Sequence, residues 1–275
     1  MLALISQILS GCLSFRMSSK EIDDYFKEKQ LSYQLDTFPF KDYSIHYIST
    51  DNDSLPLVIF VHGSPGSLSS FIEFAGDKTL RKNVSMISID RPGYGESNYG
   101  KSMESLKEQA KCIQTLVNQK SKNRSVILVG HSLGGPIIAT VAMEYPDLVQ
   151  GLIFVGASVS AELEPEENWF RYPLYTPLLR WVLPKSFRVT NDEIYKLKPQ
   201  LEKMEDDWKS ITIPVAIIQG GKDRLVDPGN VEFLLNHLTN TTPKVYFKED
   251  INHFIPWSNP ELINQAILDM IKQVE

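Results

Sequence analysis

The chain has 275 residues, of which 28 are basic and 34 acidic, so its formal net charge is -6. A chain of this length buries about 75% of its unfolded surface and forms one large domain, or one domain with an insertion. Its hydrophobic content of 42% is typical of a globular protein and excludes a disordered one. The acidic balance and the absence of a Lys/Arg-rich run argue against a nucleic-acid partner.

The cysteine and histidine spacings indicate neither a disulfide framework nor a zinc site. Two cysteines, Cys12 and Cys112, are too few for such a framework, and no CxxC or HExxH spacing occurs. We therefore expect no metal and no cofactor. The body of the chain has no run of about 18 apolar residues, the length that a membrane-spanning helix needs.

The first forty residues carry a separate signal. The apolar opening ends in Leu9-Ser10-Gly11-Cys12, which resembles the lipobox of bacterial lipoproteins, whose signal is cut before a cysteine that is then acylated. No Lys or Arg precedes the apolar run, so an N-terminal helix with a buried thiol is the alternative. The first reading predicts a membrane-anchored lipoprotein held through Cys12, and the second a cytoplasmic protein. We expect residues 13–40 to form a tether or a short surface helix.

From about residue 43, short β-type runs alternate with helical stretches, which predicts an α/β fold with a mostly parallel, doubly wound sheet. Several runs are almost continuously apolar, as in strands covered on both faces. The expected strands are Tyr43–Ser49, Leu57–Val61, Val84–Ile89, Ser125–Val129, Leu152–Val155, Val215–Gln219 and Val245–Phe247. Helical periodicity follows around 106–117 and from Pro260 onward.

Residues 158–210 break this alternation. The segment has no convincing strand, contains five prolines and holds three of the four tryptophans: Trp169, Trp181 and Trp208. We expect a helical cap inserted into a core of residues 41–157 and 211–275. The cap's aromatic side chains would either face a pocket or pack the insertion onto the core.

The strand before Gly130 runs into Gly130-His131-Ser132-Leu133-Gly134 and then into an apolar helical run. This is a G-x-S-x-G sequence between a strand and a helix, the arrangement of a nucleophile elbow. The helix N-terminus supplies amides that stabilise an anion. The pattern predicts Ser132 as a nucleophile.

A serine hydroxyl needs a base, and the sequence offers five histidines. His253 is the best candidate because it lies in a loop after the last expected strand, where its side chain can reach the top of the sheet. The alternative for it is a packing role.

The base needs a carboxylate to orient it. Asp223 follows an expected strand, whereas Asp227 stands where a helix should begin and is better interpreted as its N-cap. Both remain candidates, with Asp223 preferred. The order Ser132, Asp223, His253 is that of α/β-hydrolases and differs from the chymotrypsin and subtilisin orders.

With His62–Gly66 after one expected strand and Asp90–Ser97 after the next, five motifs occur in the order found in α/β-hydrolases. The chain therefore resembles an α/β-hydrolase-fold serine hydrolase, esterase-like and with a helical cap. The resemblance implies an oxyanion hole made by the backbone N–H groups of Ser64 and Leu133. It also implies structural roles for His62 and the Arg91–Ser97 loop. Epoxide hydrolases and haloalkane dehalogenases use an aspartate where this chain has Ser132, so those reactions are disfavoured.

The predicted function is hydrolysis of a carboxylic ester with an apolar acyl or aryl group, through an acyl-enzyme. C–C bond hydrolases, aminopeptidases and acyltransferases use the same triad and stay open as alternatives. A non-catalytic ligand-binding lipoprotein is the alternative from another class. The sequence indicates no oligomeric state.

Overall fold

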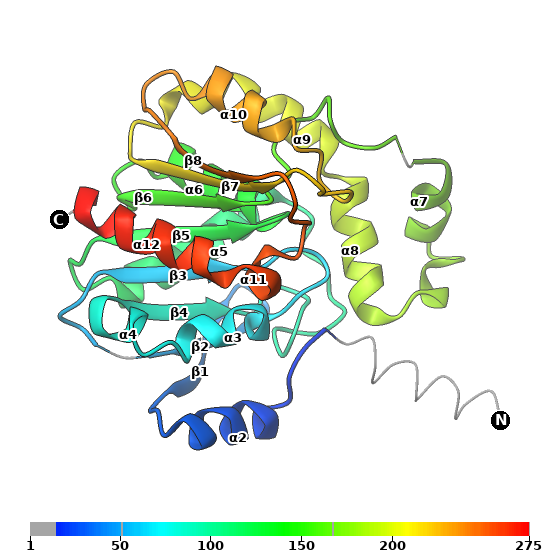
Figure 1. Cartoon of the computed structure of the whole chain (residues 1–275). Coiled ribbons are helices and arrows are strands. Elements are labelled where there is room, and N and C mark those ends of the chain that lie inside the picture. The colour runs from blue at the N-terminus through cyan, green and yellow to red at the C-terminus, as the bar shows by residue number, and fades with distance from the viewer. Residues whose placement is uncertain (1–14, 51, 167, 275) are drawn as a thin grey trace.

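The computed structural model describes residues 15–50, 52–166 and 168–274. In this part of the chain, eight strands form one sheet in the spatial order β1-β2-β4-β3-β5-β6-β7-β8 (Figure 1). Strand β2 pairs antiparallel with β1 and β4, and all other neighbours are parallel. The strands are β1 (Gln34–Phe40), β2 (Tyr43–Ser49), β3 (Leu57–Val61), β4 (Ser85–Ile89), β5 (Val126–His131), β6 (Gly151–Val155), β7 (Val215–Gly220) and β8 (Lys244–Lys248).

Helices cover both faces of the sheet, which confirms the predicted α/β class. One face is covered by α5 (Leu106–Lys120), α6 (Gly134–Glu144) and α10 (Asn230–His237). The other is covered by η1 (Leu68–Phe71), α3 (Ile72–Ala75), α4 (Leu80–Asn83), α11 (Ile255–Ser258) and α12 (Pro260–Val274). Because strands β3 to β7 lie between these two layers, every residue in them is buried, as their apolar runs predicted.

The expected boundary at residue 40 is wrong, because β1 belongs to the sheet. It pairs with β2 along its whole length and buries Phe38 and Phe40. As an edge strand covered on one face only, it tolerates polar residues and Pro39, which hid it from the sequence pattern. The helix before it, α2 (Ser19–Lys29), has a capping box formed by Ser18 and Glu21. Cys12 and the resembled lipobox lie outside the described residues.

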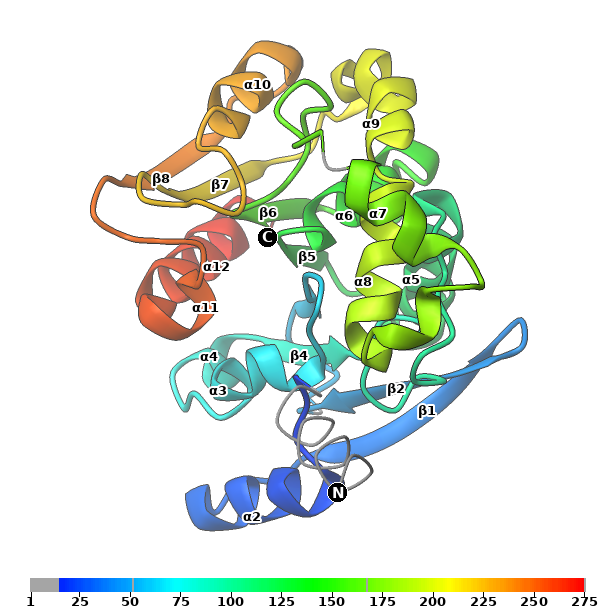
Figure 2. The same cartoon turned by 90° about the vertical axis from the view of Figure 1, so that its right-hand side faces the viewer.

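The cap connects β6 to β7 and lies at one end of the sheet (Figure 2). It consists of α7 (Asn168–Tyr175), η2 (Arg180–Val182), α8 (Lys185–Tyr195), α9 (Lys198–Met204) and η3 (Glu205–Ser210). Of its three tryptophans, only Trp208 packs the cap onto the core, against Phe154 and Phe233. Trp169 is 81% exposed and Trp181 is 71% exposed. Trp169 lines a hollow on the surface of the cap with Arg171 and Tyr195, whereas Trp181 has neither of the expected roles.

Candidate active site

Ser132 occupies the turn between β5 and α6 in a strained conformation. Its φ is 54°, in the left-handed region that residues other than glycine rarely adopt. The turn is tight: a Cβ on Gly134 would lie 2.2 Å from the Val61 carbonyl oxygen, so only glycine fits there. The Ser132 N–H donates to the Val155 carbonyl at 2.9 Å, which ties the turn to β6. This backbone geometry is that of a nucleophile elbow.

Asp223 and His253 come from the loops after β7 and β8, and their side chains meet. His253 Nδ1 lies 2.7 Å from Asp223 Oδ2, and both residues are 6% exposed. Burial raises the pKa of Asp223, but the His253 hydrogen bond and charge outweigh it, and the pKa is lowered overall. The N–H groups of Leu225 and Val226 also donate to Asp223 Oδ1, each at 2.9 Å. The carboxylate therefore stays charged and is fixed in position to orient the imidazole.

The rival carboxylate lies apart from this pair. Asp227 is exposed, and its Oδ1 accepts the Gly229 N–H at 2.7 Å. The N-cap of α10 is Gly229, so the expectation that Asp227 caps that helix is wrong. It instead fixes the turn before the helix, by the short-range bonding typical of aspartate.

Two other histidines are buried beside the site but are not placed to act as the base. His131 Nε2 lies 3.1 Å from the His253 carbonyl, and burial together with the nearby His253 lowers the pKa of His131 to about 3. His62 accepts the Arg91 N–H through Nε2 at 3.0 Å, so its Nδ1 carries the proton near the Gly63 carbonyl. Both imidazoles are neutral and hold the backbone around the elbow.

Ser64 and Leu133 lie on either side of Ser132. In the described residues, neither backbone N–H donates a hydrogen bond to another part of the protein. Both residues line the same small cavity as Ser132 and His253. The two amides are thus available to a ligand oxygen there, as an oxyanion hole requires.

Ser132 and His253 line two connected hollows. In the described residues no hydrogen bond joins the two side chains, which meet only through the cavity that they share. The larger hollow, about 520 Å³, has apolar walls contributed by Phe15, Phe187, Leu225, Phe254 and Trp257. The smaller, about 230 Å³, extends beneath the cap and is lined in part by Glu164, Arg171 and Arg224. The site therefore offers an apolar side and a polar side around Ser132.

A buried ion pair links the cap to this site. Arg91, after β4, donates from Nη1 to Oε1 of Glu193 on α8 at 2.6 Å, and both side chains are 1% exposed. Ser64 Oγ donates to Glu193 Oε2 at 2.6 Å, and Tyr94 does so at 2.7 Å. The Ser64 side chain is therefore held in place by Glu193, a residue of the cap. The sequence did not predict Glu193, because a single acidic residue in a charged helix gives no signal. It also did not predict that Phe254 and Trp257 line the apolar hollow, although their closeness to His253 in the sequence could have indicated it.

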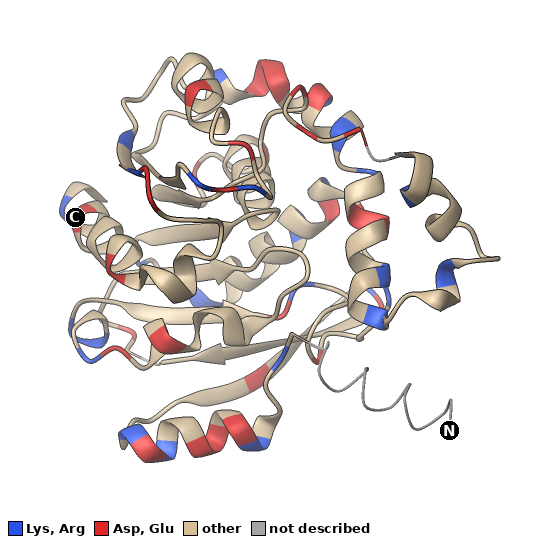
Figure 3. Cartoon of the chain, turned by 45° about the vertical axis from the view of Figure 1, so that its right-hand side comes forward, with Lys and Arg blue, Asp and Glu red and all other residues tan. Residues whose placement is uncertain are grey.

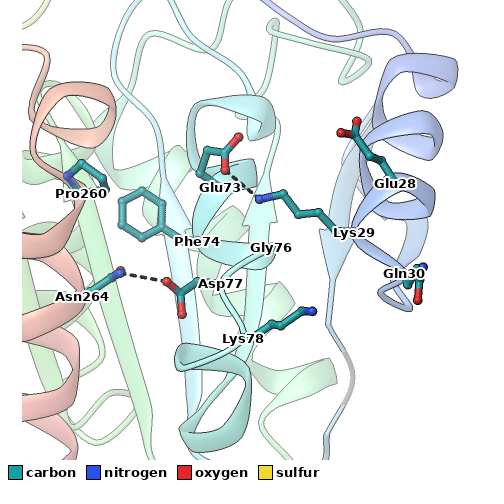
Figure 4. Close-up of a pocket in the computed structure, with 10 residues that line it drawn as sticks. All are labelled: Glu28, Lys29, Gln30, Glu73, Phe74, Gly76, Asp77, Lys78, Pro260 and Asn264. Atoms are coloured by element: carbon teal, nitrogen blue, oxygen red, sulfur yellow. Dashed lines mark hydrogen bonds and ion pairs between the residues drawn. The ribbon is translucent and has the colours of Figure 1, made fainter.

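A separate hollow lies away from Ser132 and His253, between α2, α3 and the start of α12 (Figure 4). Its walls are bridged by the Lys29–Glu73 ion pair at 3.2 Å and by the Asn264–Asp77 hydrogen bond at 3.3 Å. The first contact fastens α2 to α3, and the second fastens α12 to the turn after α3. The lining has no histidine, cysteine or serine, so it offers no nucleophile beside a base.

Comparison with known proteins agrees with this geometry. The family model described as alpha/beta hydrolase fold matches residues 56–180. An uncharacterized hydrolase of Bacillus subtilis, YugF, is 22% identical over 83% of this chain and 94% of its own length. The mouse sn-1-specific diacylglycerol lipase ABHD11 is 30% identical over 42% of this chain, but that match spans only 37% of ABHD11. The crystal structure of a membrane phospholipase A superposes with a TM-score of 0.71 at 18% identity, covering 99% of this chain and 97% of that one.

The family match covers β3 through the first part of the cap, and the structural likeness extends the same fold over almost the whole chain. Strand order, elbow and cap position all agree with it. The protein is a hydrolase with the α/β-hydrolase fold.

Proposed function

We propose that the protein is a serine hydrolase that cleaves carboxylic esters with an apolar acyl or aryl group through an acyl-enzyme. The observation that carries the proposal is the 2.7 Å contact between His253 and a charged, buried Asp223, beside Ser132 in an apolar cavity. Nucleophile, base and orienting carboxylate are thus arranged in the roles that acyl transfer needs.

In the proposed acylation step, Ser132 Oγ bonds to the ester carbonyl carbon while its proton passes to His253 Nε2. Catalytic hydrogen bonds of this kind often tighten only when the substrate binds. The Ser64 and Leu133 amides stabilise the oxyanion, at about 3 kcal/mol per donor. As the C–O bond breaks, His253 returns the proton to the leaving alcohol.

Deacylation repeats this sequence with water. His253 takes a proton from the water as its oxygen bonds to the acyl carbon, and the proton then passes to Ser132 Oγ as the acyl–oxygen bond breaks. Asp223 stabilises the imidazolium in both halves. No redox partner or metal is needed for the atoms and charges to balance.

The two hollows support an assignment of the ester's two halves. The apolar one suits an acyl chain or aryl ring, and the smaller one, with Arg171, Arg224 and Glu164, suits a polar alcohol. Each added methylene buried in the apolar hollow should raise kcat/KM by about fourfold until the hollow is full.

The test is hydrolysis of a p-nitrophenyl acyl series by the full chain and by Ser132→Ala, with labelling by a fluorophosphonate probe. We expect labelling of wild type only, and rates that rise with acyl length. Lack of labelling at Ser132 in folded protein would overturn the serine mechanism. Labelling together with turnover only of amides or β-diketones would keep the nucleophile and reject the ester substrate.

A further inference from the structure

The cap exposes large apolar side chains away from the active-site cavity. Six of them lie within fourteen residues of the chain, on α7 and on the segment through η2. They form what we call the cap patch: Trp169 (81% exposed), Tyr172 (57%), Leu178 (78%), Leu179 (40%), Trp181 (71%) and Val182 (56%). Large apolar groups clustered in this way on a soluble surface mark a place of interaction. Figure 1 shows α7 as the part of the cap farthest from the sheet.

Within the segment that carries the cap patch, the charge is opposite in sign to that of the whole chain; acidic residues begin on either side of this segment, and Glu166 lines one hollow with Trp169. Residues 168–191 contain four basic side chains (Arg171, Arg180, Lys185 and Arg188) and no acidic one, in a chain whose net charge is -6. Arg180 pairs with Asp192 on α8. Figure 3 shows basic positions along this part of the cap, with acidic ones farther along α8. Tryptophans among basic residues are typical of segments that lie in the interface of an anionic bilayer.

The cap patch and the mouth of the apolar hollow are on the same side of the molecule. Phe187 on α8, two residues after Lys185, lines that hollow and packs edge-to-face against Phe15 at 5.5 Å. In Figure 2, α7, α8 and the chain near Phe15 all face the viewer.

From this placement we propose that the cap patch docks the protein onto an anionic lipid surface, with the mouth of the apolar hollow directed to the bilayer. The apolar side chains enter the interface, while Lys185 and Arg188 lie near the lipid headgroups. A protein partner or second copy would not require the basic flank, whereas a phosphate-bearing surface does. The proposal concerns binding and holds whether or not Ser132 acts.

Vesicle binding by the full chain tests it. We expect co-sedimentation with phosphatidylcholine–phosphatidylglycerol vesicles, weaker binding to phosphatidylcholine alone, and weakening by salt. Replacing Lys185 and Arg188 by Gln should weaken binding to the anionic vesicles about fivefold per charge, the equivalent of about 1 kcal/mol each.

The apolar side is tested by Trp169→Ser with Trp181→Ser, which should weaken binding about tenfold or more. A matched control replaces two apolar residues exposed elsewhere, Leu235→Ser with Phe247→Ser, and should bind as wild type does. Hydrolysis of a short soluble ester should be unchanged in both. Brominated lipids should quench wild-type tryptophan fluorescence, and replacing Trp169 and Trp181 by Phe should remove most of that quenching.

Two results would overturn the proposal. If the Ser variant binds vesicles as wild type does and bromolipids quench nothing from Trp169 or Trp181, the cap patch is not the membrane contact. If wild type is a dimer that the Ser variant converts to monomer without vesicle binding by either, the cap patch is a contact between copies.

Discussion

Arg91 and Glu193 form a buried ion pair that joins the core to the cap, with Nη1 2.6 Å from Oε1. Ser64 Oγ hydrogen-bonds to both partners, so the pair also holds the turn that carries a proposed oxyanion donor. The cap therefore contributes to the site itself, because Glu193 helps to fix the turn that carries Ser64.

Glu193→Ala should lower the free energy of unfolding by about 3–5 kcal/mol, because it leaves the buried Arg91 charge without its carboxylate partner. At a temperature where the variant is folded, kcat should also fall by about tenfold or more as the Ser64 turn loosens. Urea unfolding and ester kinetics check the two effects.

Asp192→Asn is the matched control for Glu193→Ala. It removes another buried acidic group of α8, bonded to Ser102 and Arg180, without touching Ser64. It should reduce stability but leave kcat near wild type. Equal losses of kcat in the two variants would show that Glu193 acts only through the general stability of the cap.

Asp223→Asn should lower kcat by about 10⁴-fold, because the amide no longer holds His253 in the required tautomer. In Asp227→Asn, kcat should stay within about twofold of wild type, since Asp227 only fixes the turn before α10. Steady-state kinetics on a p-nitrophenyl ester check both variants. The reverse ranking would assign the carboxylate role to Asp227.

Stability should fall as the pH drops below about 6.5, because the buried imidazoles of His131 and His62 have lowered pKa values. Unfolded histidines bind protons below about 6.5, whereas folded His131 does so only near 3. Acid therefore favours the unfolded chain, by about 2 kcal/mol per buried imidazole between about pH 7 and about pH 5. The lowered pKa of Asp223 adds a loss only below about pH 4.

Urea unfolding at the two pH values measures this drop. In His131→Gln, the drop should be smaller by about 2 kcal/mol than in wild type. An unchanged drop would mean that His131 is protonated in the folded protein.

The tryptophans of the cap should differ sharply in their contribution to stability. Trp208→Ala should cost about 3–5 kcal/mol, because a fully buried ring between Phe154 and Phe233 is removed. Trp208→Phe should cost less, since the buried indole N–H has no partner among the described residues. Trp169→Ala should lie within about 0.5 kcal/mol of wild type. Thermal or urea unfolding of the three variants checks the order.

The sequence by itself determined the sheet, the elbow and the order of the motifs, because these depend on local pattern. Apolar runs predicted β3 to β7, and the strand–turn–helix context of Ser132 predicted the nucleophile elbow. Strand β1 was not predicted, because an edge strand with one buried face shows only a weak alternation of polar and apolar residues. Pro39 interrupts that alternation.

Only the tertiary structure decided how residues distant in the chain combine. The pairing of His253 with Asp223 rather than Asp227 depends on where two loops meet, and the Arg91–Glu193 pair joins residues 102 positions apart. The tertiary structure also decided which cap tryptophan is buried. Trp208 and Trp169 lie in the same segment, 158–210, whose composition does not distinguish them. Only Trp208 packs against β6 and α10. Local propensity determines elements; contacts between elements determine the site.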